Sequence, residues 1–432
     1  MPRWRWLMAQ LTRQLWIRAT LLGALGILAA ILAAVVERYI PWTIPGRIGA
    51  DAVDSLLTII ASSMLAVTTF SLSIMVSAYS SATSNVTPRA TKLLVEDQPT
   101  QTVLATFIGS FLFSIVGLIV LKTGAYGARG RVVLFVITIA VIALVIVSLL
   151  RWIDHLTRLG RVGETTDRVE GATRQALKAR LRDPCLGGRP LHDLIDDLPG
   201  ETIPITAEVV GYIQHIDMPA LSRLSEANDA DIYVKALPGK FVYPHVPIAW
   251  ITKPGNEVDI DTLREAVCNA FSIDDERSFD QDPRFGLAVM SEIASRALSP
   301  AMNDPGTAID VIGRTTRLLS IWANGPAGDP EDEPTYPRVH VPPLDSADLL
   351  EDGFMVIARD GAGLIEVQLR IQKSLLALSR MGDSAFRTAA LFQSRMAFDR
   401  AEAAMTLEAD KVRLRELVRS RGNEPGVTVA FA

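Results

Sequence analysis

The feature that most constrains this chain is a set of four long apolar stretches within its first 151 residues. A helix that crosses a bilayer needs about 20 mostly apolar residues, because the hydrocarbon core is about 30 Å thick. The four stretches cover residues 19–36, 52–78, 103–121 and 132–150. The sequence therefore predicts an α-helical integral membrane protein with four transmembrane helices in residues 1–151, and a lipid bilayer as its first partner.

The first of these stretches also has a basic start, as a secretory signal peptide does. Its apolar run is too long for the core of a typical signal peptide, and the residues that follow lack a clean small-x-small cleavage site. We therefore expect this stretch to remain in the protein as its first span.

Lysine and arginine residues near the ends of the spans predict the orientation in the membrane. If the N-terminus is inside, the inner side carries nine of these cations and the outer side carries five. We expect a multi-pass protein of the plasma membrane with both termini in the cytoplasm. The region after Arg151 would then be cytoplasmic.

Composition excludes several other classes of protein. Charged residues make up 21% of the chain and hydrophobic residues 49%, whereas soluble globular chains carry about 25% charged residues. A wholly soluble enzyme, a disordered chain and a disulfide scaffold are excluded. The formal net charge of −5 gives no reason to expect a nucleic-acid partner. The two cysteines, Cys185 and Cys268, make neither a disulfide framework nor a zinc site.

The second span carries a row of hydroxyl side chains. Helical residues step 100° apart, so residues three, four, seven and eleven positions apart share a face. Seven hydroxyl residues fall within an arc of about 80° by that arithmetic, namely Ser55, Ser62, Thr69, Ser73, Ser77, Ser80 and Ser84. The row extends from one end of the span to the other.

Three interpretations of this row compete. Hydroxyl groups can line a wet pathway and offer oxygens to an ion or to water. Small hydroxyl residues also let two helices approach closely, which is the commoner use. A third alternative is that each hydroxyl bonds to the backbone carbonyl one turn earlier. The length of the row favours a pathway, because a packing contact needs only a few small positions.

Charged residues flank this span at both ends. Asp51 and Asp54 could form an outer mouth that favours cations, or they could simply be acidic residues at a helix N-terminus. Arg89 and Lys92 follow the span in a short predicted helix. They could bind lipid phosphate or guard an inner mouth, and the alternative is ordinary positive-inside anchoring.

The rest of the chain predicts a cytoplasmic α+β region. We expect a helical stalk over 152–182 that continues the fourth span, with Gly160 and Gly163 as weak points. A small β-rich domain over 183–258 and a helical block over 259–324 follow. Residues 325–343, rich in Pro, Gly and acid, are predicted to be a linker. A strand near Phe354 and further helices complete residues 344–432.

Recognisable catalytic signatures are missing from the sequence. It contains no GxSxG, HExxH, phosphate-binding loop, Rossmann glycine string or CxxC motif. The five histidines lack the spacing of metal ligands. We therefore expect no catalytic residues, no metal site and no cofactor, and we expect that the protein is not an enzyme.

Three segments resemble a known family. They are residues 84–101, the string Arg277-Ser-Phe-Asp-Gln-Asp-Pro-Arg-Phe-Gly, and the string Ala297-Leu-Ser-Pro-Ala-Met-Asn-Asp-Pro-Gly-Thr-Ala. With them, nearly the whole chain resembles the bacterial predicted membrane proteins grouped as domain of unknown function 2254. The resemblance implies a protein of the bacterial inner membrane, and it implies no activity or catalytic residues.

Two functions are consistent with these patterns. The first is a homo-oligomeric channel or pore that conducts ions, lined by the hydroxyl row of the second span and regulated by the cytoplasmic domain. Several copies would be needed, because four spans cannot easily enclose a pathway. The alternative is a membrane-anchored sensor or scaffold whose cytoplasmic domain binds a ligand or a protein partner.

Overall fold

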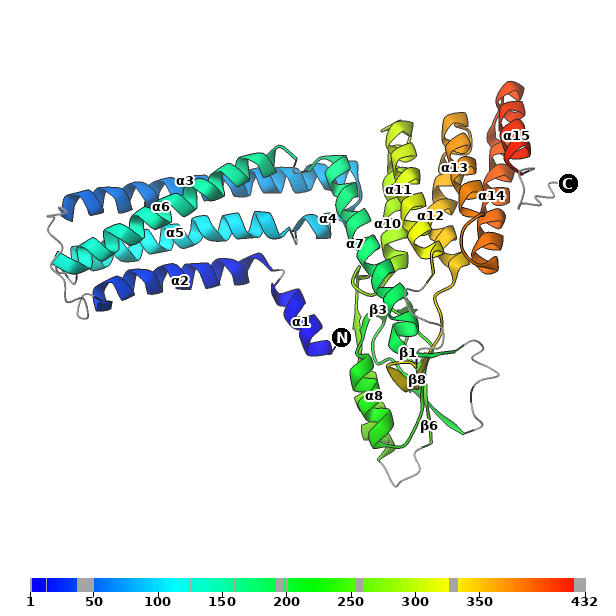
Figure 1. Cartoon of the computed structure of the whole chain (residues 1–432), viewed down its shortest axis with the longest axis horizontal. Helices are drawn as coiled ribbons and strands as arrows, with labels where there is room; N and C mark the ends of the chain where they lie inside the picture. The colour runs from blue at the N-terminus through cyan, green and yellow to red at the C-terminus, as the bar shows by residue number, and fades with distance from the viewer. Residues whose placement is uncertain are drawn as a thin grey trace. The chain divides into compact units, whose positions relative to one another are not determined.

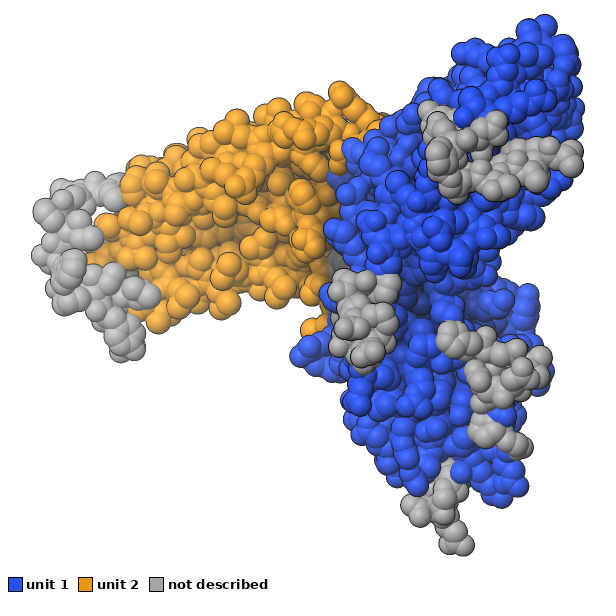
Figure 2. Space-filling view, turned by 45° about the vertical axis from the view of Figure 1, so that its right-hand side comes forward, with its two compact units in different colours: residues 1–6, 85–90, 166–432 blue, residues 7–84, 91–165 orange. Residues whose placement is uncertain are grey.

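The computed structural model describes residues 2–12, 14–36, 50–95, 97–124, 126, 128–158, 160–191, 198, 201–253, 259–325 and 333–422. The chain forms two compact units, which Figure 2 colours separately. Unit 1 contains residues 1–6, 85–90 and 166–432, and unit 2 contains residues 7–84 and 91–165.

Unit 2 is a bundle of four long helices, seen side by side in Figure 1: α2 (Leu15–Val36), α3 (Ala50–Asn85), α5 (Gln98–Lys122) and α6 (Ala128–Leu156). Each predicted span lies inside one of them, and each helix is long and apolar enough to cross a bilayer. The prediction of four such helices is confirmed. Two short helices, α1 (Arg3–Thr12) and α4 (Pro88–Val95), contain residues of both units.

Helix α5 is the best buried of the four and packs against α2 and α6. A Cβ atom on Gly26 of α2 would lie 2.6 Å from the carbonyl oxygen of Gly109 of α5, so this approach requires glycine. Buried apolar side chains form two clusters inside the bundle. Helix α3 contributes Leu57 to one cluster and Met64 to the other. A hydrogen bond also joins α6 to α3, because Nε1 of Trp152 donates to the Ser71 hydroxyl at 2.9 Å.

The predicted continuous stalk is wrong. Helix α6 ends at Leu156, and a separate helix, α7 (Val162–Arg182), begins six residues later. Gly160 between them has a φ of +78°, a left-handed conformation that no right-handed helix contains. The sequence had marked Gly160 as a weak point, and here the glycine ends the helical path.

Unit 1 contains two β-sheets. The first has five strands in the order β1-β8-β4-β6-β2, formed by β1 (Gly188–Pro190), β2 (Thr202–Thr206), β4 (Ile232–Val234), β6 (Pro247–Thr252) and β8 (Tyr336–Val341). Strand β8 pairs in parallel with β1 and β4, and the other pairs are antiparallel. The second sheet is antiparallel and joins β5 (Phe241–Val242), β3 (Gly211–Ile216) and β7 (Phe271–Asp274).

These sheets correct two predicted boundaries. The β-rich region is not confined to 183–258, because β7 and β8 come from later in the chain. Residues 325–343 are not only a linker, because they contain β8, in which Val339 and Val341 are fully buried. Pairing of β8 with β1 depends on contacts about 150 residues apart, which local Pro and Gly content cannot reveal. Helices α8 (Met218–Ala227) and α9 (Ile260–Cys268) accompany the sheets.

The remaining helices of unit 1 form one packed array, which includes α10 (Pro283–Ala297), α11 (Pro305–Ala323), α12 (Ser346–Asp360), α13 (Ile365–Leu378), α14 (Ser384–Ala404) and α15 (Glu408–Gly422). Figure 1 shows them side by side. The predicted strand near Phe354 is wrong, because that segment lies in α12. Leu350, Phe354 and Ile357 are buried there at helical spacing, so a helix buries them on one face.

Candidate functional site

The candidate site is the hydroxyl row of α3. All seven predicted residues lie on α3 and are exposed in the single chain, and we refer to Ser55, Ser62, Thr69, Ser73, Ser77, Ser80 and Ser84 as the hydroxyl face. The opposite side of α3 supplies the contacts with α2, α5 and α6. The hydroxyl face is therefore not the surface through which α3 packs inside its own bundle.

Several hydroxyl groups on this face bond within their own helix. Ser62 donates to the carbonyl oxygen of Thr58 at 2.9 Å, Thr69 to that of Leu65 at 3.0 Å, and Ser73 to that of Thr69 at 3.1 Å. This is the third interpretation made from the sequence. Each bond uses the hydroxyl proton and leaves the oxygen free to accept from a molecule outside the helix.

Apolar side chains border the hydroxyl face on both sides. Leu65, Leu72 and Val76 are exposed on one flank, and Ile59 and Phe70 are exposed on the other. By 100° steps these flanks lie about 40° to 100° from the middle of the hydroxyl face. Exposed apolar side chains therefore border the hydroxyl face on both sides, and the exposed Thr58 and Thr83 share the first flank with them.

The two aspartates of the predicted acidic mouth, Asp51 and Asp54, lie in different surroundings. Asp51 is exposed and lies about 40° from the middle of the hydroxyl face. The Asp54 carboxylate instead pairs with Nζ of Lys122, at the end of α5, at 2.7 Å. Asp51 is thus the acidic group that extends the hydroxyl face, while Asp54 joins two helix ends.

A buried carboxylate–imidazole pair lies at the other end of the bundle. Asp97 caps α5, and its Oδ2 lies 2.8 Å from Nε2 of His155 on α6. The Thr100 hydroxyl lies 3.0 Å from the same ring nitrogen, and the ring of Trp152 stacks on His155 at 5.8 Å. No spacing within the sequence indicates this pair, because its members belong to different helices.

The chain leaving α3 is held by a carboxylate of unit 1. Thr87 donates its hydroxyl to Oε2 of Glu292 at 2.9 Å, and Nη1 of Arg89 lies 2.7 Å from Oε1 of the same residue. Residues 85–90 and α10, which carries Glu292, belong to unit 1. Arg89 therefore has a protein carboxylate as its partner. Lys92, its predicted companion, is half-buried on α4.

The string 277–286 builds the start of α10. The Asp282 carboxylate is 2% exposed, caps α10 by accepting from the Phe285 N–H at 3.1 Å, and pairs with Arg277 at 2.8 Å. Burial raises the pKa of Asp282, and the adjacent Arg277 guanidinium opposes that rise. The family string is thus explained by capping and charge pairing rather than by an open site.

The string 297–308 forms the turn between α10 and α11. Asp304 caps α11 by accepting from the Thr307 N–H at 3.0 Å and from the Thr307 hydroxyl at 2.6 Å. These hydrogen bonds lower the pKa of the Asp304 carboxyl. Asn303, directly before this cap, takes a φ of +47°, which asparagine tolerates better than most residues.

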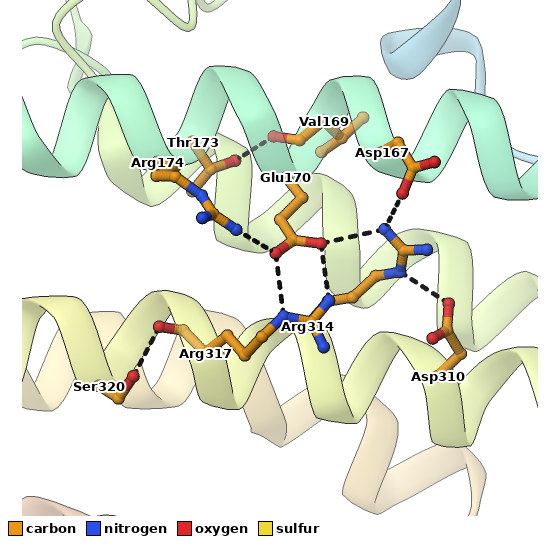
Figure 3. A network of polar contacts seen from close by, with 9 residues as sticks. All are labelled: Asp167, Val169, Glu170, Thr173, Arg174, Asp310, Arg314, Arg317 and Ser320. Carbon is orange, nitrogen blue, oxygen red and sulfur yellow. Dashed lines mark hydrogen bonds and ion pairs between the residues drawn. The ribbon is translucent and has the colours of Figure 1, made fainter.

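A network of ion pairs joins α7 to α11 (Figure 3). Glu170 of α7 is 5% exposed, and its two oxygens accept from Arg174 at 2.6 Å, Arg314 at 3.0 Å and Arg317 at 2.9 Å. Burial favours the neutral acid, but the three guanidinium groups outweigh it and hold the pKa of Glu170 below its ordinary value. Arg314 also pairs with Asp167 and Asp310.

Comparison with known proteins identifies the family. A model of the family described as "Predicted membrane protein (DUF2254)" matches residues 12–377. The chain belongs to this family. The match contains all four long helices of unit 2 and most of unit 1, and it confirms the resemblance inferred from the three sequence segments.

Curated relatives occur in mycobacteria. Uncharacterised proteins of Mycobacterium bovis and Mycobacterium tuberculosis are each 27% identical to this chain over 278 residues, which is 62% of this chain and 52% of the relative. The chain therefore spans about half the length of the curated relatives it matches. No solved structure matches the chain.

Proposed function

We propose that this membrane protein forms a homo-oligomeric channel whose pathway is lined by the hydroxyl face of α3. The observation that carries the proposal is the exposure of all seven hydroxyl residues on a long apolar helix. In a bilayer, such a face meets lipid, another copy of the chain or water. Hydrocarbon offers neither donors nor acceptors, so lipid adds nothing to the intrahelical bonds of Ser62, Thr69 and Ser73, whereas water can also donate to their oxygens.

The apolar flanks support contact between copies. If several α3 helices surround an axis with their hydroxyl faces inward, Leu65 and Leu72 of one copy can pack near Ile59 and Phe70 of the next. Oligomeric membrane proteins with cyclic symmetry use such head-to-tail contacts between two different surfaces. This arrangement accounts for both flanks as well as for the polar centre.

The charge pattern favours weak binding of small cations or water. The stretch from Ser55 to Thr87 contains no charged residue, so the pathway offers neutral hydroxyl oxygens. Asp51 at one end would raise the local concentration of cations. A pathway that conducts must bind its ion weakly enough to release it, and a row of neutral oxygens meets that requirement.

Two adjacent threonines give a matched test of this proposal. Thr69 is on the hydroxyl face, while Thr68 is half-buried on another side of α3 and donates to the Met64 carbonyl at 2.6 Å. The full chain is reconstituted in planar bilayers as wild type, Thr69→Val and Thr68→Val. We expect a cation current whose unitary conductance falls several-fold in Thr69→Val and is unchanged in Thr68→Val.

Thiol accessibility separates a wet face from a lipid-facing one. Thr69→Cys and Thr68→Cys are made in a chain that carries Cys185→Ser and Cys268→Ser, and intact membranes are treated with a charged thiosulfonate reagent. We expect modification of the cysteine at position 69 only. No reaction at either position, together with no current, would contradict the channel and leave a membrane-anchored sensor or scaffold as the function.

A further inference from the structure

A cavity of about 340 Å³ lies inside unit 1 where α7, α11, α12 and α14 come together. Its wall includes Arg180 near the end of α7 and Cys185 just after that helix. It also includes Trp322 at the end of α11, Ser346 at the start of α12, and Asp383 and Phe386 at the start of α14. Small-molecule sites have volumes of about 300–1,000 Å³ and mostly apolar walls with a few polar groups. This cavity fits that description.

Arg180 is the unusual member of the wall. Its side chain is 5% exposed, and its Nη2 donates to the Gln281 carbonyl oxygen at 3.1 Å. The buried Nη1 has no hydrogen-bond partner in the described part of the chain. The nearby Asp282 carboxylate pairs with Arg277 at 2.8 Å, and the described residues provide no ion pair for Arg180 itself.

Burying a guanidinium group without a paired anion costs free energy. Removing a cation from water costs several kcal/mol unless an opposite charge and hydrogen bonds replace the water. Burial accordingly lowers the pKa of Arg180, and the more distant Asp282 only partly opposes that effect. Arg180 lines the cavity wall, so an anion bound there would lie beside this guanidinium and offset part of the cost of its burial.

The rest of the wall restricts what that anion can be. Asp383 also lines the cavity, where its carboxylate caps α14 by accepting from the Phe386 N–H at 2.8 Å. The Asp383 carboxylate disfavours a dianion, and Arg180 is the cation among the residues that line this cavity. The Trp322 indole is fixed by its hydrogen bond to the Ser346 hydroxyl at 3.0 Å, and with Phe386 it offers an aromatic surface.

We propose that this cavity binds a small monocarboxylate with an aromatic or short aliphatic body, with the carboxylate paired to Arg180 and the body against Trp322 and Phe386. The site binds rather than reacts. Cys185 is the nucleophilic side chain of the wall, and burial raises the pKa of its thiol, so the reactive thiolate is disfavoured.

Calorimetric titration of the full chain in detergent micelles tests the ligand class. The probes are 3-phenylpropionate, its neutral amide 3-phenylpropanamide, and phenyl phosphate, which is mainly a dianion at neutral pH. We expect saturable one-to-one binding of the carboxylate and at least tenfold weaker binding of the other two. Equal binding of the amide, or no binding of the carboxylate, would overturn the proposal.

Two arginines near the end of α7 provide the matched variants. Arg182 has a side chain that is 74% exposed and pairs with Asp183, so Arg182→Gln should leave binding unchanged, whereas Arg180→Gln should weaken it at least tenfold. Ala323→Leu keeps Arg180 but fills the cavity from its α11 wall, so this variant should also abolish binding. It replaces Arg180→Gln as the test if Arg180→Gln does not fold. Unchanged binding in the folded Arg180→Gln or Ala323→Leu variant would contradict the site.

Discussion

The indole ring of Trp6 stacks on the imidazole ring of His215, with centroids 5.1 Å apart and planes inclined by 6°. The same indole donates from Nε1 to Oδ2 of Asp280 at 2.9 Å. Arg3 adds a hydrogen bond from Nη1 to the Asn269 carbonyl oxygen at 2.5 Å. Arg3 and Trp6 are thus held within unit 1, to which residues 1–6 belong.

Replacing Trp6 should release this N-terminal segment. Trp6 is 5% exposed and Trp4 is 62% exposed, so Trp6→Ala should cost about 3 kcal/mol of local stability and Trp4→Ala less than about 0.5 kcal/mol. Hydrogen–deuterium exchange measures the effect at the backbone amides of α1. Equal exchange in the two variants would show that the stack does not hold the N-terminus.

The sequence predicted what depends on local pattern. The four apolar stretches predicted the four long helices. The hydroxyl face followed from a period along one helix. Its outward orientation could not be predicted, because that depends on which other helices cover α3.

Contacts between distant segments explain what the sequence missed. Glu292 lies in α10 without any motif, and only the fold brings it to Arg89, 203 positions away. Glu170 also stands in no motif, and only the fold brings Arg314 and Arg317 of α11 to its carboxylate. The strand β8 was missed for the same reason, since its partners lie far away in sequence.

Protonation of Glu170 should weaken the α7–α11 network. Its pKa is lowered in the folded protein from an ordinary value of about 4.5, so its stabilisation is fully present above that pH and is lost as the pH falls through the folded-state pKa. At neutral pH, Glu170→Gln should lower the free energy of unfolding by about 3 kcal/mol, because it leaves Arg314 and Arg317 with a neutral partner.

Thermal unfolding of the full chain at several pH values measures this effect. The difference between wild type and Glu170→Gln should narrow as the pH drops below about 4.5. Glu351→Gln is the control, because Glu351 is exposed on α12 and its loss should change little. A difference between Glu170→Gln and wild type that is independent of pH would contradict an ionised Glu170 in the network.

Two glycines should respond to alanine in opposite directions. Gly239 has a φ of +91°, and a Cβ there would overlap the Asp282 carboxylate that caps α10. Gly239→Ala must displace that carboxylate, so we expect a loss of at least about 2 kcal/mol. Gly171 lies inside α7 with no atom within 4 Å of an added Cβ.

Gly171→Ala should therefore stabilise the protein by about 1 kcal/mol through helix propensity. The midpoint of thermal unfolding should fall in Gly239→Ala and rise in Gly171→Ala. A neutral result for Gly239→Ala would mean that the cap on α10 tolerates a new position of Asp282, and the role assigned to this part of the 277–286 string would be incorrect.

The link between Arg89 and Glu292 can be reversed in charge. Arg89 has a side chain that is 59% exposed and Glu292 one that is 33% exposed, so the pair should contribute less than about 1 kcal/mol to global stability. Its expected effect is local, because Thr87 and Arg89 both bind this carboxylate directly after α3 ends. Arg89→Glu or Glu292→Arg alone should speed hydrogen exchange over residues 86–95.

The double variant Arg89→Glu with Glu292→Arg separates attraction from mere contact. It restores opposite charges at the same two positions, so exchange over 86–95 should return most of the way to the wild-type rate, while the unfolding midpoint stays nearly constant in all three variants. If the double variant exchanges as fast as the single ones, charge attraction does not hold the chain after α3. Glu292 would then act through its hydrogen bond from Thr87, and Thr87→Val alone would reproduce the fast exchange.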